Sequence, residues 1–112
     1  MNSPNLPQEV SQLVAELCSA FSDPTRILIL YELDEIPLSV TDLTIKLNLS
    51  QPTVSRHLKV LRDRGLVTSE RQGMNIFYRL TDRRLIEALD ILRSVLRDRI
   101  MRHADLVKDP ID

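Results

Sequence analysis

The stretch Leu49-Ser-Gln-Pro-Thr-Val-Ser-Arg-His-Leu-Lys-Val-Leu-Arg-Asp-Arg-Gly-Leu66 contains the signals for one short helix and for both of its ends. Ser50 is of the residue type that accepts hydrogen bonds from the free amides of a first helical turn. Pro52 suits that same turn, where a missing N–H costs little. Gly65 can adopt the left-handed conformation that ends a helix. The stretch therefore predicts a helix between Ser50 and Gly65.

The two sides of this predicted helix differ in chemistry. Val54, Leu58 and Leu61 follow one another at spacings of four and three residues, which makes one apolar stripe. The remaining surface carries polar and basic side chains, namely Gln51, Thr53, Ser55, Arg56, Lys59 and Arg62. A helix that packs by one side and offers hydrogen-bonding groups on the other suits the major groove of DNA.

The charge distribution agrees with this interpretation, although the net charge of the chain is −1. Residues 1–50 carry two basic and seven acidic side chains, residues 51–79 carry six and two, and residues 80–112 carry seven of each. Phosphate binding depends on the local density of basic groups, so the positive middle segment favours a nucleic-acid partner. A charged face that is merely solvated is the alternative interpretation for any single helix.

The composition is that of one folded domain, with 112 residues, 43% hydrophobic and 28% charged. No apolar run approaches the roughly 18 residues that span a bilayer, and no secretion signal is visible. We therefore expect no membrane partner and a cytoplasmic location. A single cysteine, Cys18, excludes an internal disulfide and a zinc finger of paired cysteines.

The residues before the quoted stretch predict two further helices. Residues 1–7 are expected to be a flexible N-terminus, and residues 8–21 have helical apolar spacing. Asp23 and Pro24 are a plausible cap and first residue for the next helix. That helix is apolar nearly all round over residues 27–33, so we expect it to be buried on most sides in the centre of the domain.

A third short helix is predicted directly before the quoted one. Ser39 and Asp42 match a capping box, with a serine followed by an acidic residue three positions later, ahead of a helix over residues 40–47. Asn48 and Leu49 then make a tight turn. Two short helices joined in this way, the second one polar outside, predict a helix-turn-helix.

The pattern after Gly65 predicts a hairpin. Residues 66–71 and 75–80 alternate as strands do, around Gln72-Gly73-Met74. The hairpin carries Arg71 and Gln72 near its tip and occupies the position of the wing in a winged helix.

A long helix is expected over residues 83–107, capped by Thr81-Asp82, with residues 108–112 as a flexible C-terminus. Its apolar stripe consists of Leu85, Leu89, Leu92, Leu96 and Ile100. A second copy of the chain would cover this surplus of apolar surface. The predicted fold is thus mainly α with a small β-hairpin, a winged helix-turn-helix over residues 8–107 that forms a homodimer through residues 8–21 and 83–107.

In this order and spacing, several motifs resemble those of the ArsR/SmtB family of small bacterial transcriptional repressors. The matching sequence segments are Asp23-Pro-Thr-Arg26, Ile27-Leu-Ile-Leu30, Leu49-Ser-Gln-Pro-Thr-Val-Ser-Arg-His-Leu-Lys-Val-Leu61, Gly65-Leu-Val67, Arg71-Gln-Gly73 and Tyr78-Arg-Leu80. The resemblance covers about residues 10–100. It implies a homodimer that binds a palindromic operator in double-stranded DNA and blocks transcription until an inducer loosens it; the inducer and the operator sequence stay open.

The resemblance also implies which residues contact DNA. These are Gln51, Thr53, Ser55 and Arg56 of the recognition helix, with Lys59 toward phosphate and with Arg71 and Gln72 of the wing. His57 lies beside the apolar stripe, and we interpret it as a flanking histidine that packs and bonds to backbone or phosphate. Two-fold symmetry would place the two recognition helices about one DNA turn, roughly 34 Å, apart.

Two metal sites of the family lack their ligands here. The positions of the first site, aligned on Tyr78-Arg-Leu80, hold Asp82, Arg84, Val95 and Asp98 in place of a set with two histidines. Neither arginine nor valine ligates zinc. The second site has no thiolate, because its cysteine positions hold Ser39 and Thr41. We expect no metal site and no cofactor.

Two alternatives remain for the function, a thiol sensor and a protein-docking module. Cys18 is interpreted as a buried, inert residue of the first helix, and the alternative is a sensor thiol for oxidants or a thiophilic ligand. Winged helices also serve as protein-docking modules, although these need no basic outer face. An enzyme is not indicated, because we find no nucleophile paired with a base and no glycine-rich phosphate loop.

Overall fold

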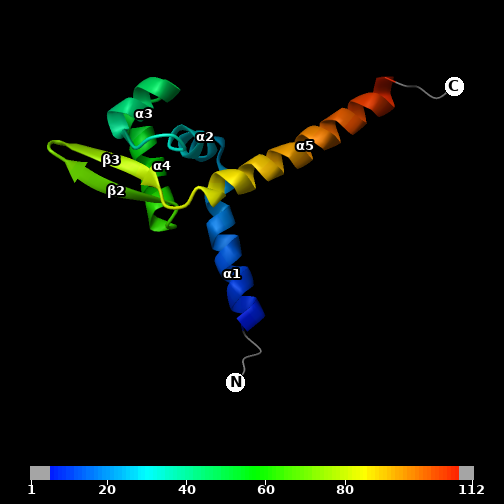
Figure 1. Cartoon of the computed structure of the whole chain (residues 1–112), viewed down its shortest axis with the longest axis horizontal. Helices are drawn as coiled ribbons and strands as arrows, with labels where there is room; N and C mark the ends of the chain where they lie inside the picture. The colour runs from blue at the N-terminus through cyan, green and yellow to red at the C-terminus, as the bar shows by residue number, and fades with distance from the viewer. Residues whose placement is uncertain (1–5, 109–112) are drawn as a thin grey trace. The chain divides into compact units, whose positions relative to one another are not determined.

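The computed structural model describes residues 6–108, which are mainly helical with a small antiparallel sheet (Figure 1). This confirms the predicted fold class. Within the described part, the residues from Leu6 to Asp82 form one compact unit and the residues from Arg83 form a second. The elements are α1 (Leu6–Ser19), η1 (Ala20–Ser22), α2 (Pro24–Glu32), β1 (Leu38–Ser39), α3 (Val40–Leu47), α4 (Gln51–Asp63), β2 (Val67–Gln72), β3 (Asn75–Leu80) and α5 (Arg84–Lys108).

The helix boundaries near the two ends differ from the prediction by a few residues. Helix α1 begins at Leu6, so Leu6 and Pro7 are helical although we assigned them to a flexible segment. A proline is tolerated there because the first turn has no use for its N–H. Lys108 likewise belongs to α5. The flexibility expected for residues 1–5 and 109–112 concerns positions outside the described residues.

Helix α2 begins as predicted, and one of its apolar residues, Leu28, is exposed. The Asp23 carboxylate accepts hydrogen bonds from the Thr25 amide at 2.8 Å and from the Arg26 amide at 3.4 Å. Ile29 and Leu30 have no exposed surface, but Leu28 is 52% exposed. The expected burial is therefore interrupted at Leu28, because that side of α2 remains open in the single chain.

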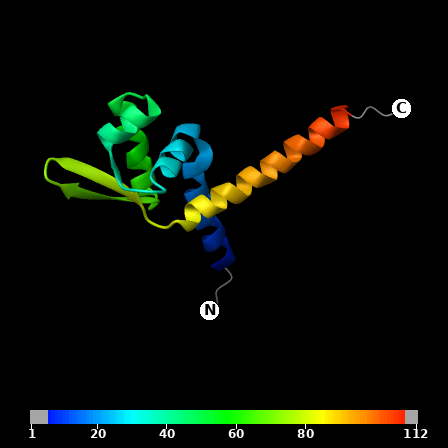
Figure 2. The same cartoon turned by 45° about the horizontal axis from the view of Figure 1, so that its top comes forward.

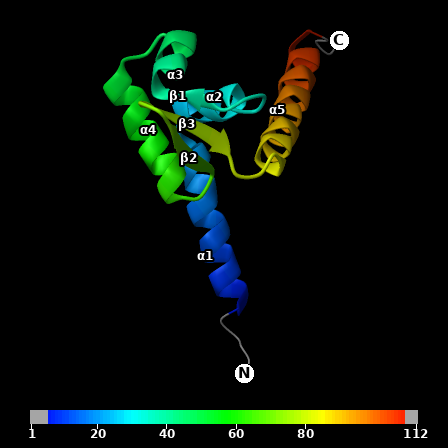
Figure 3. The same cartoon turned by 60° about the vertical axis from the view of Figure 1, so that its left-hand side comes forward.

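The helix-turn-helix consists of α3, α4 and the turn between them (Figure 3). The predicted capping box is present: the Ser39 amide donates to Asp42 at 3.1 Å, and the Asp42 amide donates to the Ser39 hydroxyl at 3.1 Å. Helix α3 is followed by its C-cap residue Asn48, whose φ of 56° is left-handed. Three residues, 48–50, separate the two helices, so their relative placement depends on a very short segment.

The hairpin is present and belongs to a sheet of three strands in the order β1-β3-β2. The register of β2 and β3 runs from Val67 opposite Leu80 to Gln72 opposite Asn75. Two residues, Gly73 and Met74, connect these strands, and Gly73 has the positive φ that such short hairpin turns require. The third strand, β1, was not predicted; it places Leu38 opposite Tyr78 and Ser39 opposite Phe77.

Thr81 has a different role from the one predicted. Its hydroxyl donates to the carbonyl oxygens of Gly65 at 2.9 Å and Leu66 at 3.0 Å. Helix α5 starts three residues later, at Arg84, so Thr81 is not its cap. The side chain instead ties the end of β3 to the segment that follows α4.

Helix α5 is one unbroken helix (Figure 2). Several of its apolar side chains are about half exposed or more, namely Ile91, Leu92, Val95, Leu96, Ile100 and Met101. Ile86 and Leu89 near its start are buried. Within the part of the chain that the structure describes, no helix combines the length and apolarity needed to cross a membrane.

Candidate nucleic-acid interface

Helix α4 is held by its apolar stripe and by both of its ends. Val54, Leu58 and Leu61 have no exposed surface, which fixes the opposite side of the helix toward solvent. At the N-terminus, the Thr53 amide donates to the Ser50 hydroxyl oxygen at 3.3 Å. The predicted cap is therefore confirmed.

The C-terminus of α4 ends in a Schellman motif. The Gly65 amide donates to the Arg62 carbonyl at 3.0 Å, and the Leu66 amide donates to the Leu61 carbonyl at 2.9 Å. Gly65 has a φ of +81°, the left-handed conformation that the sequence predicted. Both ends of the helix are thus satisfied within the chain, and its outer side chains are presented on a fixed backbone.

The outer side of α4 exposes most of the residues that the sequence singled out. Gln51, Ser55, Arg56 and Lys59 are exposed, and the neighbouring Arg62 is exposed as well. Thr53 is half-buried, and its hydroxyl oxygen accepts a hydrogen bond from Ser50 at 2.8 Å. The arrangement gives amide and hydroxyl groups at the first turn and guanidinium and ammonium groups further along.

The hairpin supplies a second exposed set of polar groups. Arg71 and Gln72 are exposed and lie at the end of β2, directly before the turn. Met74 at the turn is 94% exposed and was not singled out from the sequence. Arg79 lies 3.7 Å from Glu70 on the neighbouring strand, so part of the positive charge of the hairpin is paired.

His57 does not lie on the exposed side of α4. The residue is only 9% exposed, with Nδ1 3.3 Å from a guanidinium nitrogen of Arg26 and Nε2 3.9 Å from the Asp23 carboxylate. The His57 ring is therefore enclosed on the inner side of α4, and a contact of His57 with DNA stays a prediction. The helical wheel placed His57 at the edge of the stripe, and its partners on α2 explain why it turns inward.

Cys18 on α1 is exposed in the single chain, which contradicts the interpretation of a buried residue. Among residues 6–108, no three His, Cys, Asp or Glu side chains gather as a metal centre would require.

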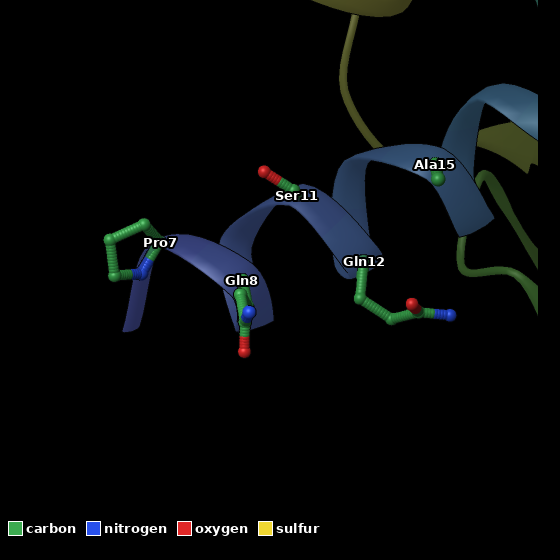
Figure 4. Close-up of a pocket in the computed structure, with 5 residues that line it drawn as sticks. All are labelled: Pro7, Gln8, Ser11, Gln12 and Ala15. Atoms are coloured by element: carbon green, nitrogen blue, oxygen red, sulfur yellow. The ribbon is translucent and has the colours of Figure 1, made fainter. Parts of the chain in front are cut away.

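A shallow hollow on α1 is lined by Pro7, Gln8, Ser11, Gln12 and Ala15, all from this one helix (Figure 4). None of these five side chains is charged, so the hollow offers no group that would bind an ion or catalyse a reaction.

The fold and the exposed side of α4 define the chain as a winged helix-turn-helix protein. The sequence model described as "Bacterial regulatory protein, arsR family" matches residues 23–69. The HTH-type transcriptional regulator NmtR of Mycobacterium tuberculosis is 40% identical over 92 residues, which cover 80% of this chain and 76% of NmtR. The chain belongs to the ArsR family of bacterial regulatory proteins.

Two further proteins resemble this chain. The HTH-type transcriptional repressor SmtB of Mycobacterium tuberculosis is 42% identical over 79 residues, 70% of this chain; the match covers only 58% of the length of SmtB. The crystal structure of NolR from Sinorhizobium fredii superimposes with a TM-score of 0.73 at 32% identity, covering 85% of this chain and 94% of NolR. NmtR and SmtB are both named as regulators of transcription.

Proposed function

We propose that this protein is a homodimeric transcriptional repressor that inserts α4 of each subunit into the major groove of an operator. The observation that carries the proposal is the division of α4 into two sides. Its apolar stripe is completely buried, while Gln51, Ser55 and Arg56 near its N-terminus are exposed. Amide, hydroxyl and guanidinium groups are those that bond to base edges and phosphates.

Basic groups beside these residues supply the phosphate contacts. Lys59 lies one turn beyond Ser55 on α4, and Arg71 and Gln72 lie at the tip of the hairpin. Thr53 is half-buried, so we assign it a single contact with DNA, made by its hydroxyl group. Such contacts fix the position of the protein on the duplex, and the first turn of α4 reads the bases.

The dimer forms through α1 and α5, whose apolar side chains are exposed in the single chain. Val10, Leu13 and Val14 on α1 are between 50% and 64% exposed. Leu92, Leu96 and Ile100 on α5 are between 53% and 66% exposed. Two-fold symmetry then requires a palindromic operator whose half-sites lie about one DNA turn apart.

The signal that releases the operator is not a metal ion at the known family positions. Arg84 and Val95 stand where two zinc-binding histidines would be required.

We place the protein in the cytoplasm, with the DNA it controls. SmtB is named a repressor, which favours repression over activation for this chain as well.

The test is a fluorescence-anisotropy titration with a labelled duplex that covers the region directly upstream of the gene. The wild-type protein should bind in the nanomolar range with an affinity that falls steeply with salt, because counterions are released from the phosphates. Arg56→Ala should weaken binding by about tenfold or more, the usual cost of a lost base contact. Arg102→Ala on α5 is the matched control and should bind as the wild type does.

The dimer is tested separately, by sedimentation equilibrium at micromolar concentration. The wild type should have twice the mass of the chain, whereas Leu96→Asp should be monomeric because a buried carboxylate at the interface is costly. A monomeric wild type, or a wild type without salt-dependent binding to the upstream duplex, contradicts the proposal.

A further inference from the structure

A buried histidine lies between two charged side chains at the junction of α2 and α4. His57 on α4 is 9% exposed, and Asp23 and Arg26 at the start of α2 face its two ring nitrogens. The distances are 3.3 Å from Nδ1 to Nη1 of Arg26 and 3.9 Å from Nε2 to the Asp23 carboxylate.

The chemistry of the partners determines where the ring carries its proton. A guanidinium group has only donors, so Arg26 donates and Nδ1 of His57 accepts. The neutral ring then carries its proton on Nε2, on the side of the Asp23 carboxylate. The three side chains therefore select one tautomer and one orientation of the imidazole.

Arg26 also bonds to the segment that ends α1. Its Nε donates to the Ala20 carbonyl at 2.9 Å, and its Nη2 donates to the Ser19 carbonyl and the Ser22 hydroxyl, both at 3.3 Å. Carbonyls at the end of a helix lack partners within the helix, and arginine commonly satisfies them. One planar guanidinium thus joins the end of α1 to the middle of α4.

We infer that Arg26 is a positioning residue that sets the place of α4 relative to α1 by bonding to His57 and to the end of α1 at the same time. The inference rests on the proposed function and deepens it. Helix α1 contributes to the proposed dimer contact and α4 to the proposed groove contact, so this junction fixes how far each α4 stands from the dimer axis. Lysine cannot replace Arg26, because a single ammonium group lacks the rigid fork of donors.

The first test is spectroscopic and needs no DNA. The ¹⁵N chemical shifts of the His57 ring are measured in the full-length protein at about pH 8, where an ordinary imidazole is neutral. The wild type should show the Nε2–H form alone. In Arg26→Lys the two nitrogen shifts should move toward the average of exchanging tautomers, whereas Arg102→Lys should leave them unchanged.

The second test uses a pair of variants at position 57 and the upstream duplex. In His57→Asn the amide oxygen lies as many bonds from Cβ as Nδ1 does, so it can still accept from Arg26. In His57→Phe the ring shape is kept and the acceptor is lost. We expect His57→Phe to bind about tenfold more weakly than the wild type, and His57→Asn to recover most of that loss.

The outcomes separate the two proposals. A wild-type tautomer and wild-type affinity in Arg26→Lys, or equal losses in His57→Asn and His57→Phe, would overturn the inference. If Arg26→Lys does not fold, the pair at position 57 decides. If the wild type does not bind the duplex, the proposed function fails, while the wild-type tautomer still tests whether Arg26 bonds to His57.

Discussion

The ammonium group of Lys59 lies 3.0 Å from the carboxylate of Asp63, one turn further along the exposed side of α4. Both side chains are more than half exposed. An exposed pair of this kind contributes little to stability, about 0.3–0.5 kcal/mol. The pair has a larger effect on DNA binding, because Asp63 places a negative charge on the surface that we propose faces phosphate.

Asp63→Asn should therefore strengthen DNA binding. The substitution removes a charge that repels phosphate and releases Lys59 to bind it. We expect the affinity for the upstream duplex to rise by about threefold at low salt, and by less at high salt. Fluorescence anisotropy at two salt concentrations measures the change. Glu9→Gln on α1 is the control, and equal effects of the two variants would show that only net charge matters.

Gly65→Ala should destabilise the fold through its backbone alone. No atom lies within 4 Å of the position that a Cβ would occupy, so no steric clash arises. The φ of +81° is nevertheless unfavourable for alanine, at a cost of about 1–2 kcal/mol. Gly65→Asn should cost less, since asparagine adopts this conformation more readily. Urea unfolding of both variants would show this order, and equal losses would contradict it.

Asp23 should make the stability of the protein depend on acid pH. Burial raises the pKa of Asp23, but hydrogen bonds from the Thr25 and Arg26 amides and the nearby His57 and Arg26 charges outweigh it, so the pKa lies below its ordinary value of 3.8. A carboxylate with a lowered pKa stabilises the fold above the pKa of the unfolded chain and loses that effect as the pH falls through the pKa of the folded state.

The comparison with Asp23→Asn isolates this effect, because asparagine can still cap α2 but has no charge. The melting temperature of the wild type should exceed that of the variant at about pH 6, and the difference should shrink below about pH 4. A difference that stays constant across this range would contradict the assignment.

Zinc should leave operator binding unchanged. We propose that the family metal sites are absent, because the positions that the resemblance assigns to the two zinc-binding histidines hold Arg84 and Val95, and the two cysteine positions hold Ser39 and Thr41. Anisotropy titrations with zinc and with a chelator should therefore give the same affinity for the upstream duplex. A strong loss of binding in zinc would reveal a metal site built from other residues.

The features predictable from the sequence are those with local signals. The capping box of Ser39 and Asp42, the cap at Ser50 and the left-handed Gly65 each depend on residues within a few positions of one another. The exposed side of α4 followed in the same way, from the spacing of its apolar stripe. These signals were sufficient for the helix-turn-helix.

The features that escaped prediction depend on partners far along the chain. Strand β1 has two residues and no periodicity of its own, and it exists because Leu38 and Ser39 pair with β3. Thr81 bonds to the segment after α4, which its sequence neighbours do not indicate. His57 turned inward for the same reason, since its partners lie on α2.

Ser39 belongs to two structures at once, since it is the last residue of β1 and the N-cap of α3. No linker separates the sheet from the helices at this point. A displacement of the hairpin by a DNA backbone would be transmitted through one peptide unit to the start of α3. Occupancy of the groove and attachment of the wing should consequently be cooperative, so that variants at Arg56 and Arg71 combined lose less free energy of binding than the sum of their separate losses.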